Sequence, residues 1–223
     1  MSEKAVPELF RDLDDVAVGL ILKAAQRCSR DRGEVFCRQG ERTTNLYLLT
    51  DGLVKVGATT NSGKEVLLDW IKPEEGFGLG ALLSPPTENV WTIYAATRSV
   101  ALEWDAETIH CFAQSYPKFY RSALAIALRW TRQLQQRFEE LSTEKVEQRL
   151  ARLVLFLAKR FATKEPAEVR TSDIELAQMT GTNLFTVNKL VHGWQRLGYV
   201  NKSRGRLLLV DTEGLLTIAG SSG

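Results

Sequence analysis

The stretch Asp173–Leu197 reads DIELAQMTGTNLFTVNKLVHGWQRL, and it decides the fold of the C-terminal part of the chain. Ser172 precedes it, and Glu175 follows three residues later, which is the spacing of a capping box at a helix start. We therefore expect a short helix from Asp173 to Met179, a turn at Gly181 and a longer helix from Asn183 to about Leu197. Glycine tolerates the positive φ that such a turn needs. Short helix, turn and longer helix is the helix-turn-helix arrangement.

The apolar residues of this stretch predict where the two helices touch. The expected buried positions are Ile174, Leu176 and Ala177 in the first helix and Val187, Leu190, Val191 and Trp194 in the second. Directly after them, residues 199–211 read YVNKSRGRLLLVD, two short extended stretches around a basic turn. We interpret this as a β-hairpin wing whose tip carries Lys202, Arg204 and Arg206, placed to reach phosphates beside a groove.

Upstream of this region the chain is helical. The pattern predicts one helix over residues 144–162, ended by Thr163–Pro166 because proline cannot continue a helix. A longer helix follows Pro117, with a nearly unbroken heptad stripe. The members of the stripe are Tyr120, Ala123, Ala127, Trp130, Leu134, Phe138 and Leu141. The stripe can pack on the chain's own N-terminal domain or form a seam with a second copy, and we expect the seam.

Residues 34–105 change to short runs of β-branched and aromatic residues between turn formers. Asp51-Gly52 and Asn61-Ser62-Gly63 separate alternating stretches, which is a hairpin signal. Six to eight strands in a small antiparallel barrel or roll are expected. Residues 8–27 have helical spacing and predict a helix before the roll.

Composition limits the classes of function. The chain has 223 residues, a net charge of +2 and 44% apolar residues, enough for two domains. It lacks a nucleophile elbow, a P-loop and a GxGxxG run and has only two histidines, so we expect no enzyme. With no long apolar run, no signal-like start and an odd, scattered set of three cysteines, we expect a cytoplasmic protein without membrane contact.

Several short motifs occur in a fixed order along residues 15–215. They are Gly40, Leu46–Leu49, Gly52–Val56, Gly63–Glu65, Pro73, Phe77-Gly78, Ala81–Leu83, Gln148–Ala151, Ile174, Ala177, Gly181-Thr182 and Thr186-Val187. In this order they resemble the cyclic-AMP receptor protein and fumarate–nitrate regulator (CRP/FNR) superfamily of bacterial transcription regulators. The resemblance implies an α+β fold with an antiparallel β-roll over 1–116, a dimerisation helix over 117–143 and a winged helix-turn-helix over 144–223. It also implies a homodimer bound to double-stranded DNA, with RNA polymerase as a further partner if the protein activates transcription.

In that family the second helix of the motif enters the major groove. By position its reading residues here are Asn183, Leu184, Phe185, Thr186, Asn188, Lys189 and His192. We expect base hydrogen bonds from Asn183, Asn188 and Lys189. Phosphate contacts are expected from Thr171, Ser172, Thr182, Thr186, Lys202 and Arg204. Leu184 and Phe185 replace the arginine and glutamate that the family most often has, so they can touch only apolar groups such as thymine methyls. Phe185 has the alternative of packing against the groove wall or the wing.

Cyclic-nucleotide binders of the family use a glutamate for the ribose and an arginine for the cyclic phosphate. Those positions here are Leu79 and Asn89. Burying an anion without a cation is costly, so we expect neither cyclic AMP nor cyclic GMP. The equivalent space would be lined by Leu79, Leu82, Asn89, Trp91, Trp130 and Leu134. It either takes an uncharged or aromatic effector or is a filled core with no effector.

The chain also lacks the residues that would bind other cofactors. Cys28, Cys37 and Cys111 cannot supply the four clustered thiolates of an iron–sulfur centre, and we expect no haem and no metal at His110 or His192. Two alternatives stay open: a regulator that responds to thiol oxidation at Cys37 or Cys111, and an effector-binding regulatory subunit that does not bind DNA. The wing and the helix-turn-helix argue against a subunit that does not bind DNA, because such a subunit would not need them.

Overall fold

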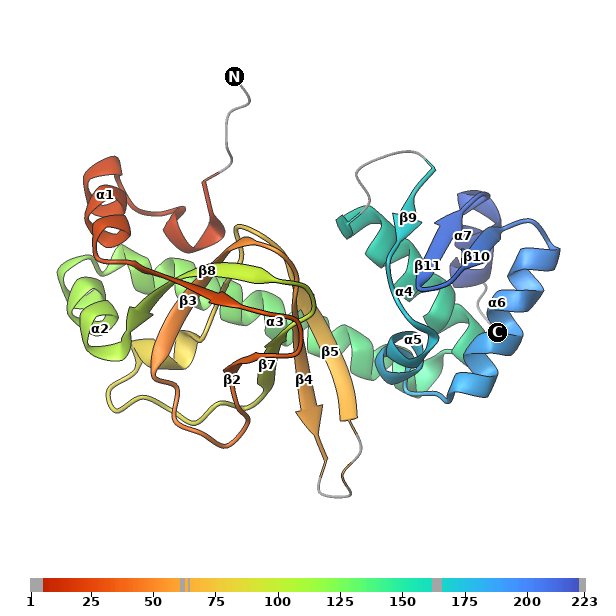
Figure 1. The fold of residues 1–223 in the computed structure, drawn as a ribbon, viewed down its shortest axis with the longest axis horizontal. Coiled ribbons are helices and arrows are strands. Elements are labelled where there is room, and N and C mark those ends of the chain that lie inside the picture. The colour runs from red at the N-terminus through yellow and green to blue at the C-terminus, as the bar shows by residue number, and fades with distance from the viewer. Residues whose placement is uncertain (1–5, 61–62, 64, 162–165, 221–223) are drawn as a thin grey trace. The chain divides into compact units, whose positions relative to one another are not determined.

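The protein is described by a computed structural model covering residues 6–60, 63, 65–161 and 166–220. It forms two compact units, Met1–Gln133 and Leu134–Gly223, and Figure 1 labels the elements of each. The boundary falls inside one long helix, α3 (Lys118–Thr143). Among the described residues, no helix combines the length and the apolar character that crossing a bilayer requires.

The first unit contains a roll of two four-stranded antiparallel sheets. One has the order β1-β8-β3-β6 and the other β2-β7-β4-β5. The strands are β1 (Gln26–Arg30), β2 (Val35–Cys37), β3 (Asn45–Asp51), β4 (Val54–Thr59), β5 (Glu65–Ile71), β6 (Gly76–Phe77), β7 (Thr92–Ala95) and β8 (Ser99–Asp105). The inward residues of both sheets form an aromatic core in which the rings of Tyr47 and Phe77 stack at 4.9 Å.

The two turn signals have different outcomes. β4 and β5 pair antiparallel across the predicted Asn61–Gly63 turn, so that hairpin is confirmed, although residues 61, 62 and 64 lie outside the described ones. The hairpin predicted at Asp51-Gly52 is wrong, because β3 and β4 lie in different sheets and the chain crosses between them there. Gly52 has φ 89° and packs against the backbone of Arg98, where a β-carbon would stand 2.4 Å from the carbonyl oxygen.

Four helical elements pack on one side of the roll (Figure 1). They are η1 (Glu8–Phe10), α1 (Asp15–Lys23), α2 (Ala106–Ser115) and α3, with the short η2 (Leu79–Leu82) between β6 and β7. The single helix expected over residues 8–27 is instead divided, because the Asp14 side chain caps a new helix by accepting a hydrogen bond from the Ala17 amide at 2.8 Å.

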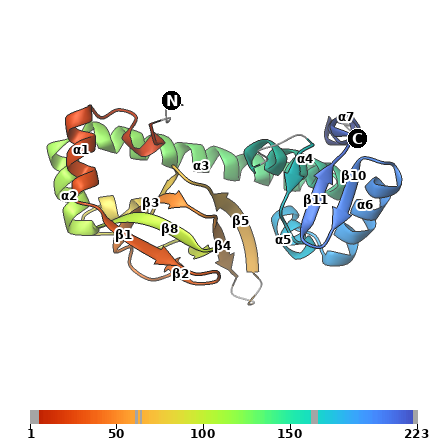
Figure 2. The ribbon, with the colours of Figure 1, turned by 45° about the horizontal axis from the view of Figure 1, so that its top comes forward.

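The second unit is a winged helix-turn-helix. It contains the end of α3, α4 (Val146–Phe161), β9 (Glu168–Val169), α5 (Asp173–Thr180), α6 (Leu184–Arg196), β10 (Val200–Ser203), β11 (Arg206–Leu209) and α7 (Thr212–Gly220). β10, β11 and β9 form one antiparallel sheet. Figures 1 and 2 show β10 between β11 and α6. The α+β class and the order of roll, long helix and winged helix-turn-helix are therefore confirmed. The residues proposed to end α4 fall mostly outside the described ones.

Candidate nucleic-acid interface

Local sequence signals fix the two helices of the motif. The Ser172 hydroxyl accepts a hydrogen bond from the Glu175 amide at 3.3 Å, and the Glu175 carboxylate accepts one from the Ser172 amide at 2.9 Å. This is the predicted capping box. Gly181 ends α5 with φ 66°, in the left-handed region. Asn183 then caps α6, its side-chain oxygen accepting a hydrogen bond from the Thr186 amide at 2.9 Å.

One face of α6 is buried and the opposite face is open. Val187, Val191 and Trp194 are at most 1% exposed, and the Trp194 indole donates a hydrogen bond to Glu147 of α4 at 3.0 Å. The side chains on the outer face are exposed: Leu184, Phe185, Lys189, His192 and Arg196. α6 is therefore held by its inner face while the outer face stays open to a partner.

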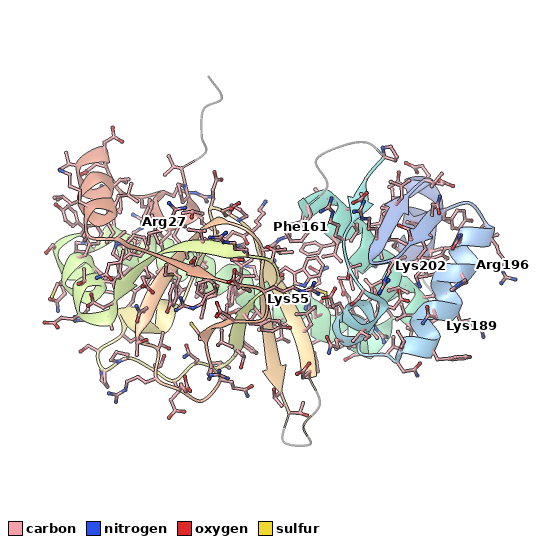
Figure 3. The ribbon with its side chains drawn as sticks, viewed as in Figure 1. Arg27, Lys55, Phe161, Lys189, Arg196 and Lys202 are labelled. Carbon is pink, nitrogen blue, oxygen red and sulfur yellow. The ribbon has the colours of Figure 1, made fainter. Side chains whose placement is uncertain are left out.

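Lys189 and Arg196 are the cations of that outer face. They lie seven residues apart, two helical turns, and therefore project from the same side of α6. In Figure 3 both extend from this helix. Neither makes a hydrogen bond or ion pair with another residue of the described part of the chain. Arg196 was missed by the sequence reasoning, which considered only the first two turns; its spacing from Lys189 was the available signal.

Beside α6 lies a groove of about 660 Å³ between the start of α5, α6 and the wing. Its lining includes Ile174, Leu184, His192, Gln195, Arg204 and Arg206. Ile174 was expected to be buried but is 58% exposed. Ile174 lines this groove, so of the three positions of α5 that were predicted to be buried, Leu176 and Ala177 are confirmed.

Three predicted contact residues are engaged within the protein. Thr171 is 7% exposed, and its hydroxyl donates to the Glu175 carboxylate at 3.2 Å. Asn188 accepts a hydrogen bond from Lys202 at 2.9 Å and donates one to the Leu184 carbonyl at 3.1 Å. Lys202 also pairs with Asp173. The phosphate contacts predicted for Thr171 and Lys202 and the base contact predicted for Asn188 stay predictions, at groups that are already hydrogen-bonded within the protein.

The other predicted residues stay on the accessible side of the motif. Exposed or half-buried are Ser172, Thr182, Asn183, Leu184, Phe185, Thr186, Lys189, His192 and Arg204. Phe185 is 78% exposed, so little of its ring is covered by the rest of the protein. His192 bonds through Nδ1 to the Asn188 carbonyl at 2.8 Å, which leaves Nε2 on the exposed side of α6.

The heptad stripe of α3 divides into two faces. Ala123 is 7% exposed, and it, Tyr120 and Trp130 pack against the roll core. Tyr120 and Trp130 are half-buried, so their side chains are only partly covered by the roll, and the seam itself stays a prediction. The exposed apolar side chains of α3, which we name the outer face of α3, are Leu124, Ala125, Ala127, Leu128, Leu134, Phe138 and Leu141.

The predicted effector residues lie in several places. Leu79, Leu82 and Trp130 pack on the core between the roll and its helices, while Trp91 packs on the core inside the roll. Leu134 is exposed and belongs to the second unit. Asn89 accepts a hydrogen bond from the Thr43 hydroxyl at 2.9 Å and donates one to the Glu41 carbonyl at 3.0 Å. The position expected to meet a ligand phosphate therefore holds a neutral amide bonded to its neighbours.

The cysteine thiols differ in environment. Burial raises the pKa of Cys37 to about 12, and burial with the nearby Glu103 carboxylate raises that of Cys28 to about 11. Since the thiolate is the reactive form, both are poorly suited to oxidation near neutral pH. Cys111 is exposed. Within the described residues no three His, Cys, Asp or Glu side chains gather as metal ligands would.

Comparison with known proteins matches both units. A cyclic nucleotide-binding domain family matches residues 28–116, and a Crp-like helix-turn-helix domain family matches residues 148–218. The CRP-like cAMP-activated global transcriptional regulator of Mycobacterium tuberculosis is 28% identical over 212 residues, 93% of this chain and 94% of that protein. The transcriptional regulator SdrP of Thermus thermophilus is 30% identical over 185 residues, 79% of this chain and 85% of that protein.

A solved structure agrees with these matches. A CRP-family transcriptional regulator from Thermus thermophilus has a TM-score of 0.74 and 26% identity, covering 87% of this chain and 97% of that one. The named relatives are transcription regulators, which confirms the prediction that this chain is not an enzyme.

Proposed function

Because the chain belongs to the CRP/FNR superfamily of transcription regulators, we propose that it acts as a homodimer that binds specific sites on double-stranded DNA. The observation that carries this proposal is the outer face of α6, where Lys189 and Arg196 project from a helix whose opposite face is locked into the domain core. A helix presented in this way fits the major groove, which is wide enough to admit it.

The proposed DNA contacts fall into base contacts and phosphate contacts according to the chemistry of each side chain. Lys189 can donate to guanine O6 or N7, and the spare amide of Asn183 can donate to a base acceptor. Leu184 and Phe185 are 45% and 78% exposed and are suited to thymine methyl groups. Arg204 at the wing tip and Arg196 at the end of α6 are suited to phosphates, and the hydroxyls of Ser172, Thr182 and Thr186 stay in the phosphate-binding set.

The homodimer is proposed through the outer face of α3. Leu124, Leu128, Phe138 and Leu141 are 59%, 49%, 71% and 52% exposed. Four large apolar side chains on one helix exceed what a solvated helix normally presents. Leu124 and Leu128 are four residues apart and Phe138 and Leu141 are three residues apart, and both separations suit a two-helix seam. Pairing of two α3 helices would bring two copies of α6 to one duplex, which is what a two-fold symmetric operator requires.

The roll is proposed to respond to a signal other than a cyclic nucleotide, or to none. Leu79 and Asn89 offer neither a carboxylate for a ribose nor a guanidinium for a phosphate, and the Asn89 amide is satisfied by Thr43 and Glu41. The residues therefore do not fit the ligand for which this domain family is named. An uncharged effector and an effector-free roll both remain compatible with this composition.

Selection of bound sites from random duplex DNA with the full-length protein tests the proposal. We expect a two-fold repeat with half-sites about one helical turn apart, and an affinity that falls about 10³-fold or more between 50 and 200 mM salt. Enrichment of no sequence, together with no salt-dependent retention on duplex DNA, would contradict the proposal and favour a regulatory module that does not bind DNA.

A further inference from the structure

Three elements of the winged helix-turn-helix meet at the ammonium group of Lys202. Its Nζ lies 2.5 Å from Oδ2 of Asp173, the first residue of α5, and 2.9 Å from Oδ1 of Asn188 on α6. Lys202 itself belongs to β10 of the wing. Figure 3 shows Lys202 between the wing and α6, whereas Lys189 and Arg196 extend from α6.

The environment of Lys202 differs from that of a free surface cation. The side chains of Lys202 and Asp173 are only 22% and 21% exposed, so water screens their attraction less than it screens an exposed pair. A lysine ammonium has three donors, and Asp173 and Asn188 use two of them. Withdrawing Lys202 to reach a phosphate would leave the Asp173 carboxylate without its counter-charge beside a polyanion. Lys202 is therefore poorly placed for a phosphate contact.

The same bond sets the orientation of Asn188. Only the carbonyl oxygen of an amide can face an ammonium group, so the Asn188 nitrogen points away from Lys202 and donates to the Leu184 carbonyl at 3.1 Å. Both ends of the Asn188 side chain are thereby fixed to the protein. The turn of α6 that carries Leu184 and Asn188 is tied to the wing through one lysine.

We propose that Lys202 is a positioning residue that fastens the wing to α5 and α6, rather than a DNA contact. The inference rests on the proposed DNA-binding function and adds that Lys202 contributes to it by holding the wing in position against α5 and α6. Arg204, which is exposed at the wing tip, keeps the phosphate contact that the sequence predicts for it.

Substitution of Asp173 distinguishes the two roles of Lys202, because they predict changes in DNA affinity in opposite directions. If Lys202 bound phosphate, Asp173→Asn would free it and remove a negative charge near DNA, so binding would tighten. If Lys202 fastens the wing, Asp173→Asn weakens binding by about tenfold, the order expected for losing one charge-assisted hydrogen bond. Lys202→Met should weaken binding similarly while leaving the slope of log affinity against log salt unchanged, because no phosphate contact is lost; a lost contact would lower that slope by about 0.9.

Matched variants control for charge and for general damage. Lys159→Met on α4 and Glu213→Gln in the first turn of α7 make the same charge changes at exposed positions away from the wing. They should change affinity less than threefold. Lys202→Arg should retain most of the affinity because a guanidinium can bridge the same partners. The double variant Asp173→Asn/Lys202→Met should bind no more weakly than the worse single variant, since both remove one interaction.

Hydrogen exchange of the DNA-free protein gives a readout that does not depend on DNA. Amides of residues 200–209 should exchange faster in Lys202→Met and Asp173→Asn and at the wild-type rate in the two control variants. Unchanged exchange in these amides, a lower salt slope for Lys202→Met, or tighter binding by Asp173→Asn would each overturn the inference. If the wild-type protein does not bind duplex DNA, the proposed function fails, and the exchange rates still decide whether Lys202 fastens the wing.

Discussion

The guanidinium of Arg149 donates two hydrogen bonds to the carbonyl oxygen of Thr180, from Nε at 3.2 Å and from Nη2 at 3.1 Å. Thr180 is the last residue of α5, so its carbonyl is one of the groups left without a partner inside the helix. Nη1 of Arg149 donates to the Glu144 carbonyl at 2.6 Å. One side chain near the start of α4 thus supports both the end of α3 and the turn that leads to α6.

Replacing Arg149 should therefore destabilise the second unit. Arg149→Met leaves the carbonyls of Thr180 and Glu144 without their charged donor, and we expect the free energy of unfolding to fall by about 2–3 kcal/mol. Chemical denaturation monitored by tryptophan fluorescence, to which Trp194 contributes from the second unit, measures it. Arg170→Met is the matched control, because Arg170 has a 75% exposed side chain and should cost less than about 0.5 kcal/mol. A cost for Arg149→Met as small as that of the control would show that these bonds do not hold the turn.

Self-association should depend on the outer face of α3. Phe138→Glu replaces a 71% exposed phenylalanine that two subunits would bury together. Losing about 2 kcal/mol of burial in each subunit raises the dimer dissociation constant by about 10³-fold. Sedimentation equilibrium measures this constant. Leu216→Glu, at a 50% exposed position on α7, should leave it unchanged; a Phe138→Glu variant that dimerises like the wild type would place the dimer interface elsewhere.

Lys189 and Arg196 should affect binding in different ways. If Lys189 reads a base, Lys189→Ala weakens binding to the selected site by about 1–3 kcal/mol and relaxes specificity at that position. Arg196→Ala should weaken selected and unrelated duplexes alike and lower the salt slope by about 0.9. Titrations of both variants with both duplexes at several salt concentrations separate these effects. Equal losses on both duplexes for Lys189→Ala would make it a phosphate contact instead.

Much of this interface could be predicted from local sequence signals. The Ser172–Glu175 capping box, the turn at Gly181 and the start of α6 at Asn183 each depend on residues within a few positions, and all are present. The order of motifs was also sufficient to identify the CRP/FNR superfamily. Local rules work here because backbone caps and turns are satisfied by their immediate neighbours.

The sequence was least informative where distant segments meet. The sequence indicates only that Lys202 is a basic residue of the wing, because its hydrogen-bond partners Asp173 and Asn188 lie 29 and 14 positions away along the chain. The stripe of α3 was assigned to one face, because spacing alone does not show that the roll covers Ala123 while Phe138 stays open. Asp51-Gly52 gives the same turn signal for a hairpin and for a crossing between sheets. Packing across the chain decided each case.

Cyclic AMP should not stabilise the protein. A ligand at 100 times its dissociation constant raises the free energy of unfolding by about 2.7 kcal/mol. Because Asn89 provides no positive charge for the phosphate, we expect no shift in melting temperature with cyclic AMP or cyclic GMP at about 1 mM. The cAMP-activated regulator of Mycobacterium tuberculosis is the positive control. A melting temperature that rises with nucleotide concentration would mean that another cation replaces the missing arginine.

Thymine methyl groups should account for part of the specificity, because Leu184 offers no hydrogen bond to a base and lies on the outer face of α6 with Phe185. Replacing thymine by deoxyuridine in the selected site removes only the methyl group and keeps every base-edge donor and acceptor. Burying one such group is worth about 0.8 kcal/mol, or about fourfold in affinity. The wild type should therefore bind the uracil site about fourfold more weakly at each contacted position, measured by fluorescence anisotropy.

Leu184→Ala should bind the thymine and uracil sites with equal affinity at the position that Leu184 contacts, while Phe185→Ala should lose this sensitivity at a different position. If both variants keep the full preference for thymine, the methyl groups are read by other residues, and Ile174, which lines the same groove, would be the next side chain to replace.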